Sequence, residues 1–173
     1  MDAAPDLAAI RLVGFDVDGV LTDGRIIIDD EGRESKNFHS RDGLGLMILK
    51  RAGLEPILIT GRFSRLLAVR AAELGLSELH QKVEDKWRVM ADILARRGLT
   101  PGQAAFAGDD LIDLPILTRV GLALAPADAV PEVKAAAHFV ASAPGGRGAV
   151  RQMIEYILKG QGRWDDVVRS YIR

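Results

Sequence analysis

Short apolar segments alternate with amphipathic segments along almost the whole chain, and this alternation limits the fold more than any other feature. Continuous apolar runs, which suit strands covered on both faces, occur at residues 12–17, 56–60, 104–107 and 121–125. Between them, apolar residues recur at helical spacing, as in residues 87–97 and 150–158. Strands joined by right-handed helical crossovers form a Rossmann-like, doubly wound parallel sheet, which is the α/β fold that we predict.

The composition indicates a folded chain without an affinity for polyanions. The 173 residues are 48% hydrophobic and 27% charged, which excludes a disordered chain. The formal net charge is -1, so we expect no nucleic-acid partner and no anionic membrane partner. The longest apolar runs have about six residues, against about 20 in a membrane-spanning helix, and the acidic N-terminus predicts no secretory signal. Because there is no cysteine, disulfides, zinc–thiolate sites and cysteine nucleophiles are excluded, and a cytoplasmic location fits.

One segment interrupts the alternation. Residues 25–28 and 33–38 have the composition of two strands, and the turn between them ends in Gly32. This pattern predicts a β-hairpin over residues 24–39 that projects after the first strand. A small exposed hairpin with an Ile-Ile-Ile strand is unstable alone, so we expect it to pack on a second subunit.

Polar residues follow the predicted strands at the edge where parallel sheets bind ligands. The first strand is followed by Asp16 and Asp18, and the 104–107 run by Asp109. These residue types suit phosphoryl transfer through a covalent aspartyl-phosphate. Asp16 is the expected nucleophile, and Asp18, one strand period further, is expected to protonate the leaving alcohol and then activate water. Mg²⁺ is expected to be held by Asp16, Asp109 and the backbone carbonyl of Asp18.

The remaining polar residues of this edge suit the phosphate. Thr60 and Gly61 end the second core strand, and Lys86 begins the 87–97 helix, so these three are expected to bind the phosphoryl oxygens. Gly19 allows a sharp turn after the aspartates. Asp110 and Asp113 follow Asp109, and either could support the metal.

These residues resemble the four motifs of the haloacid dehalogenase superfamily of phosphotransferases, in the same order. They are residues 15–20, 59–62, Lys86 and 108–113. Residues 21–24, 38–45 and 145–151 are similar to the 3-deoxy-D-manno-octulosonate 8-phosphate phosphatases, and that resemblance runs from about residue 10 to residue 164. It implies a haloacid dehalogenase-like fold.

The resemblance also implies a function and an assembly. Members of this group are Mg²⁺-dependent homotetramers without a cap domain, and hairpins from neighbouring subunits form the tetramer core. They release phosphate from an eight-carbon acid-sugar phosphate in lipopolysaccharide precursor biosynthesis. By position, Arg62 extends toward the sugar, and Arg41 and Arg147 are further candidates for its carboxylate or hydroxyls.

We expect residues 1–173 to form a single phosphatase domain, with the hairpin serving oligomerisation and residues 160–173 forming a C-terminal tail. The last nine residues, 165–173, depart from the family and have the composition of a short extra helix. If that helix forms, the flexible tail that reaches a neighbouring active site in the family is ordered here.

Three other functions fit parts of the sequence. One is a phosphatase for a nine-carbon sialic-acid-type 9-phosphate, although those relatives carry lysine in place of Arg41. Another is a non-catalytic assembly module, which the intact Asp16, Asp18, Lys86 and Asp109 disfavour. A response-regulator receiver also uses an aspartyl phosphate, a threonine and a lysine, but its acidic pair precedes the phosphorylated aspartate.

Overall fold

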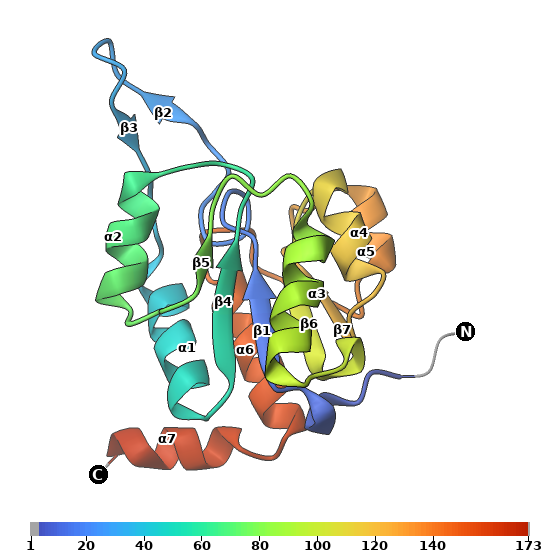
Figure 1. Ribbon diagram of the computed structural model, residues 1–173. Helices are drawn as coiled ribbons and strands as arrows, with labels where there is room; N and C mark the ends of the chain where they lie inside the picture. The colour runs from blue at the N-terminus through green and yellow to red at the C-terminus, as the bar shows by residue number, and fades with distance from the viewer. Residues whose placement is uncertain (1–3, 173) are drawn as a thin grey trace.

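The centre of the molecule is a six-stranded parallel sheet (Figure 1), seen in a computed structural model that describes residues 4–172. In spatial order its strands are β5 (Leu79–His80), β4 (Glu55–Ile59), β1 (Leu12–Phe15), β6 (Ala104–Ala107), β7 (Leu122–Ala125) and β8 (Phe139–Val140). β1 lies between β4 and β6, with Leu12 level with Glu55 on one side and Ala104 on the other. The predicted doubly wound parallel sheet is therefore confirmed.

Helices cover both faces of the sheet. One face carries α1 (Ser40–Arg51), α2 (Arg65–Glu73) and α6 (Ala149–Gly160). The other carries α3 (Lys86–Arg97), α4 (Leu114–Leu117) and α5 (Pro131–Ala136). Single 3₁₀ turns occur at Leu7–Ala9, Pro101–Gln103 and Leu111–Asp113.

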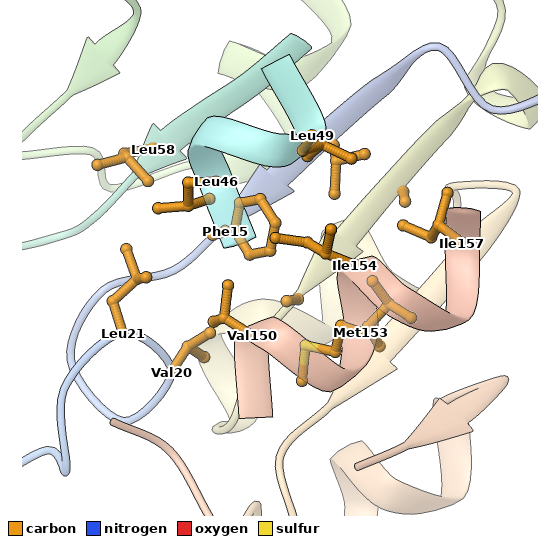
Figure 2. Packing of buried hydrophobic residues seen from close by; sticks show 14 of the residues in the cluster. Phe15, Val20, Leu21, Leu46, Leu49, Leu58, Val150, Met153, Ile154 and Ile157 are labelled. Carbon is orange, nitrogen blue, oxygen red and sulfur yellow. The ribbon is translucent and has the colours of Figure 1, made fainter. Parts of the chain in front are cut away.

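Successive residues of each central strand enter different cores. Leu12 packs with the α3 side, whereas Val13 and Phe15 pack with the α1 and α6 side. On that side Phe15 lies against residues of both helices, among them Leu46 and Ile154 (Figure 2). Full burial of such a side chain contributes about 1.5–3 kcal/mol relative to exposure. The continuous apolar runs in the sequence reflect this burial on both faces.

The β-hairpin projects beyond the carboxyl ends of the strands (Figure 1). It consists of β2 (Ile27–Ile28) and β3 (Glu34–Ser35), which pair antiparallel, so its strands are shorter than the predicted 25–28 and 33–38. The predicted hairpin is confirmed.

The C-terminal segment forms a further helix, α7 (Trp164–Ile172), at the opposite end of the sheet from the hairpin (Figure 1). Trp164 and Val167 pack against the core, and the Arg51 guanidinium donates to the Tyr171 hydroxyl at 3.1 Å. The predicted extra helix is confirmed, with Arg173 outside the described residues. Within residues 4–172, no helix has the length and hydrophobicity needed to cross a membrane.

Candidate active site

Three carboxylates meet at the carboxyl edge of the sheet. Asp16 follows β1, Asp109 lies two residues after β6, and Asp113 ends the 3₁₀ turn that comes next. Each offers one oxygen to a group whose oxygens lie within 4.8 Å of one another. The neighbouring strands β1 and β6 thus bring together side chains that are about 90 residues apart in the sequence, as expected for a parallel sheet.

The loop after β1 folds tightly around this cluster. The carbonyl of Val17 accepts hydrogen bonds from the amides of Leu21 and Thr22 at 2.9 and 3.0 Å. Gly19 has φ +92°, and a Cβ at this position would lie 2.0 Å from Oδ2 of Asp109. Only glycine fits here, because both the backbone conformation and the approach of Asp109 exclude a side chain.

The same turn corrects one expectation. β1 ends at Phe15, so Asp16 and Asp18 are not related by a strand period, and Asp18 lies within the turn. The third carboxylate that lies with Asp16 and Asp109 is that of Asp113.

Lys86 is the cation of the cluster. Asp85 caps the start of α3 by accepting from the amide of Arg88, so Lys86 stands at the first residue of the helix. Its Nζ lies 3.0 Å from Oδ1 of Asp16 and 2.6 Å from Oδ1 of Asp113, and its side chain is 2% exposed. The ammonium therefore bridges the expected nucleophile and Asp113.

Asp113 also holds the loop that carries Asp109. Its Oδ2 accepts from the amide of Asp109 at 3.0 Å and from that of Asp110 at 3.4 Å. Asp110 itself is exposed and caps the following turn through the amide of Leu111. The sequence left the roles of these two residues open, and the structure places Asp113 with the carboxylate cluster.

Burial and mutual repulsion shift the titration of the cluster. Burial raises the pKa of Asp16 to about 6, against the attraction of Lys86 and with the repulsion of Asp113. Burial also raises the pKa of Asp109 to about 7, and the charges of Asp16 and Asp113 add to this effect. For Lys86, burial favours the neutral amine, but the two contacting carboxylates raise the pKa above its ordinary value.

The residues present fit a divalent cation. Three carboxylates face one ammonium, so the cluster carries excess negative charge when all are ionised. Hard oxygen donors at this spacing are the ligands that Mg²⁺ prefers. Burial and repulsion raise the pKa of Asp109, and a bound cation would favour its ionised form.

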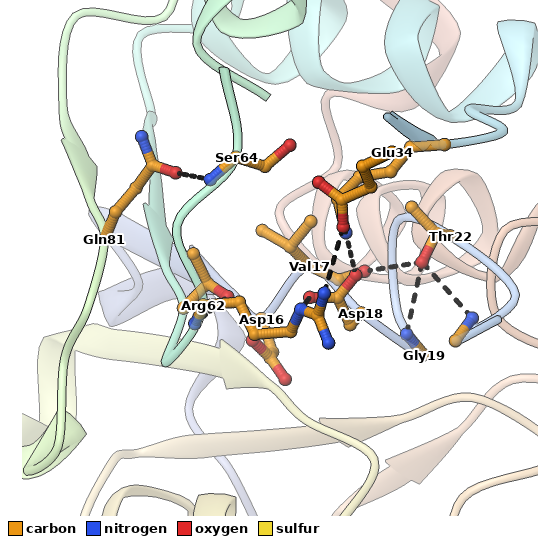
Figure 3. Close-up of polar contacts among 12 residues, drawn as sticks. Asp16, Val17, Asp18, Gly19, Thr22, Glu34, Arg62, Ser64 and Gln81 are labelled. Atoms are coloured by element: carbon orange, nitrogen blue, oxygen red, sulfur yellow. Dashed lines mark hydrogen bonds and ion pairs between the residues drawn. The ribbon is translucent and has the colours of Figure 1, made fainter. Parts of the chain in front are cut away.

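Asp18 lies in a second polar group beside the first (Figure 3). Its Oδ1 forms an ion pair with Nζ of Lys36, and its Oδ2 lies 3.8 Å from Nε of Arg62. Nη2 of Arg62 donates to Oε1 of Glu34 at 3.0 Å. Arg62, expected to contact the sugar, is thus held next to the expected acid–base residue.

The two residues before Arg62 lie at the same edge of the sheet. The hydroxyl of Thr60 is buried and accepts from the amide of Arg62 at 3.3 Å. Gly61 follows it directly beyond β4, the strand beside β1. Both expected phosphate-binding residues therefore follow the end of β4, the strand next to the one that precedes Asp16.

Arg41 and Arg147 are not brought into either polar group. Within residues 4–172, neither side chain makes an ion pair or hydrogen bond. Their neighbours in sequence do meet, because Oδ2 of Asp42 accepts from the amide of Gly148 at 3.0 Å. The two arginines are thus the sequence neighbours of a contact between the starts of α1 and α6.

Sequence reasoning missed Glu34, Lys36 and Asp42. The hairpin was expected only to contact other subunits. Its second half, however, places Lys36 against Asp18 and Glu34 against Arg62. Charged residues in the second half of a projecting hairpin, where the chain returns toward the sheet, are the signal that could have indicated Glu34 and Lys36.

Comparisons with known proteins agree with this geometry. The sequence profile of the haloacid dehalogenase-like hydrolases matches residues 58–154. The chain is 41% identical over 157 residues to the 3-deoxy-D-manno-octulosonate 8-phosphate phosphatase of Escherichia coli strain K12, covering 91% of this chain and 84% of the relative. The aspartates, lysine and glycine turn described above thus occur in a chain with extensive similarity to a phosphatase.

Solved structures extend the match to three dimensions. The enzyme of that name from Yersinia pestis has a TM-score of 0.90 and 42% identity, with 92% of this chain and 86% of the other covered. The one from Moraxella catarrhalis, solved in complex with magnesium ion, phosphate ion and a KDO molecule, has a TM-score of 0.93 and 36% identity, with 96% and 95% covered. The chain belongs to the haloacid dehalogenase-like hydrolases, in the group that contains the 3-deoxy-D-manno-octulosonate 8-phosphate phosphatases.

Proposed function

We propose that this protein hydrolyses 3-deoxy-D-manno-octulosonate 8-phosphate to the free sugar acid and phosphate, a phosphoric monoester hydrolysis in lipopolysaccharide precursor biosynthesis. The choice of substrate rests on the similarity, over 96% of this chain, to the Moraxella enzyme in complex with magnesium, phosphate and KDO. The carboxylate cluster and Lys86 supply the residue types that the reaction needs.

The proposed reaction has two steps. An oxygen of Asp16 attacks phosphorus, the bond to the sugar oxygen breaks, and Asp18 donates a proton to the departing alcohol. Asp18 then accepts a proton from water, which attacks the phosphorus and releases phosphate from Asp16. A pKa of about 6 leaves most of Asp16 ionised, and hence nucleophilic, at neutral pH.

The other residues bind the metal and the phosphate. Asp16, Asp109 and the backbone carbonyl of Asp18 are the proposed Mg²⁺ ligands. When bound, Mg²⁺ supplies positive charge that lowers the repulsion between carboxylate and phosphate. Thr60, Gly61 and Lys86 donate to the phosphoryl oxygens.

Substrate recognition is assigned to three arginines. Arg62 is nearest to Asp18 and so to the leaving sugar. Arg41 and Arg147 remain proposed contacts for the sugar carboxylate or hydroxyls, supported by the contact of their neighbours Asp42 and Gly148 between the starts of α1 and α6.

We also propose a homotetramer in the cytoplasm, with the hairpin of residues 24–39 in its core. Ile26, Ile27 and Ile28 are 57%, 40% and 59% exposed, which supports their burial by other subunits. The chain contains no cysteine, which a reducing compartment permits.

Phosphate release with Mg²⁺ tests the substrate directly. We expect preference for 3-deoxy-D-manno-octulosonate 8-phosphate over a nine-carbon sialic-acid-type 9-phosphate, and a clear preference for the second would overturn the assignment. Asp16→Asn is the matched control, because it removes the nucleophile with little change in shape. Turnover that survives this substitution would refute the aspartyl-phosphate step, and a wild-type protein inactive on a panel of sugar phosphates would favour the assembly module.

A further inference from the structure

The lysine that ends the hairpin differs from its surroundings. The side chain of Lys36 is 2% exposed, whereas most of the hairpin is open to solvent. Its Nζ forms an ion pair with Oδ1 of Asp18 and lies 3.4 Å from Oε1 of Glu34. A buried ammonium is unfavourable unless carboxylates compensate it, so this location depends on these two acids.

Arg62 completes a ring of alternating charge. It contacts Glu34 at 3.0 Å and approaches Asp18 at 3.8 Å, so each acid faces both cations. The two oxygens of Asp18 consequently have separate partners, with Oδ1 facing Lys36 and Oδ2 facing Arg62. Two partners on opposite oxygens fix the rotation of a carboxylate group as well as its position.

The two cations differ in freedom. The side chain of Arg62 is 41% exposed and can turn toward a bound sugar, whereas that of Lys36 is enclosed. When Arg62 turns to substrate, Asp18 loses one partner and keeps the other. Lys36 is therefore the contact that can hold Asp18 throughout a reaction cycle.

We propose that Lys36 is a positioning residue that holds the carboxylate of Asp18 toward the reaction centre in both steps, while Glu34 holds Arg62 until substrate binds. This inference rests on the proposed aspartyl-phosphate chemistry and deepens it. It gives the hairpin a role in its own subunit's active site, in addition to the proposed role in assembly.

The test separates the two steps with ³²P-labelled p-nitrophenyl phosphate. Its leaving group needs no proton, so phosphorylation of Asp16 depends little on Asp18, whereas hydrolysis of the phosphoenzyme still needs a base. For Lys36→Met we expect steady-state turnover at least tenfold below wild type. In acid-quenched samples we expect the phosphorylated fraction of subunits to be at least threefold higher than in wild type.

Lys36→Arg keeps a cation, and we expect it to recover part of both values. Lys50→Met is the matched control, because Lys50 lies away from the site and, among residues 4–172, its side chain bonds only to the carbonyl of Gly75. If Lys36→Met loses the native circular dichroism spectrum, the turnover and the phosphorylated fraction are compared with wild type in Lys36→Gln, which keeps a hydrogen-bond donor.

A phosphorylated fraction at or below that of wild type would overturn the proposal, because a general loss of structure slows both steps together. Turnover within twofold of wild type would overturn it as well. The aryl phosphate contains no sugar, so a wrong sugar assignment leaves this comparison intact. Failure of the nucleophile assignment is recognised separately, as turnover by Asp16→Asn.

Discussion

Lys86 balances only part of the negative charge that the strand ends bring together. It contacts Asp16 and Asp113, and both acids are almost fully buried. Asp109 lies in the same cluster, with a pKa raised to about 7 by burial and by its acidic neighbours. The remaining charge is the physical reason why this site favours a metal cation.

Removing the ammonium is expected to affect stability as well as activity. Lys86→Met keeps the side-chain length but leaves two buried carboxylates without a cation, and breaking such a pair costs about 3–5 kcal/mol. We expect the free energy of unfolding in urea to fall by that order, and turnover to fall at least a hundredfold. Lys159→Met, which removes an exposed ion pair with Glu155, should change stability by less than about 1 kcal/mol.

The raised pKa values predict how pH acts on the metal-free protein. Asp16 and Asp109 have folded-state pKa values of about 6 and about 7, above an unfolded value of 3.8. Their contribution to stability is fully present below that value and is lost as pH rises through 6 and 7. We therefore expect the metal-free melting temperature to fall between pH 5 and pH 8.

Magnesium competes with these protons, so it should raise the melting temperature more at pH 8 than at pH 5. The control is Asp109→Asn, whose metal-free profile should be flatter. Equal stabilisation by Mg²⁺ at both pH values would contradict the assignment of these carboxylates to the metal.

At the scale of elements, two helices meet through a buried carboxylate. Asp42, in the first turn of α1, accepts from the amides of Gly148 and Arg151 at the start of α6. The loop before α6 in turn packs on the loop after β1, because a Cβ on Gly145 would lie 1.8 Å from the carbonyl oxygen of Gly19. Asp42 thus links helix packing to the position of the loop that follows Asp16.

Asp42→Ala tests this link. It leaves two amides at a helix start without their acceptor, so we expect a loss of about 1–3 kcal/mol in urea unfolding. We also expect kcat/KM to fall several-fold. Asp92→Asn, at an exposed position on α3, is the control and should change neither value. If the Asp42→Ala protein is destabilised but keeps its kcat/KM, the contact of Asp42 with α6 does not influence the loop after β1.

Elements with long apolar runs were predictable, and short ones were not. β1, β4, β6 and β7 each have four consecutive buried residues, which leave a clear pattern in the sequence. β5 and β8 have two residues each, too few for any periodicity. The place of Asp16 and Asp109 beyond the strand ends was predictable, because parallel strands end at one edge of the sheet. The contacts of Lys36 and Asp42 span 18 and more than 100 residues, and residue spacing does not indicate which distant pairs meet.

At the scale of the whole molecule, exposed apolar residues occur at both ends of the sheet. The hairpin end carries Ile26 and Ile28, and the α7 end carries Ile172 at 78% exposure. If the hairpin forms the tetramer core, substitutions at the hairpin end of the sheet should weaken assembly, and substitutions at the α7 end should not. We expect Ile26→Ser combined with Ile28→Ser to reduce the mass measured by light scattering, and Ile172→Ser to leave it at that of the tetramer. The reverse result would place the interface at α7.

The helical state of the C-terminal segment also sets how far it can extend. Wound as α7, the nine residues of Trp164–Ile172 rise about 14 Å, whereas the same residues fully extended would span about 30 Å. The helix starts at the amino end of the sheet, away from the aspartates (Figure 1). Wound as a helix, the segment spans about half of its extended length and lies at the end of the sheet opposite to Asp16 and Asp109.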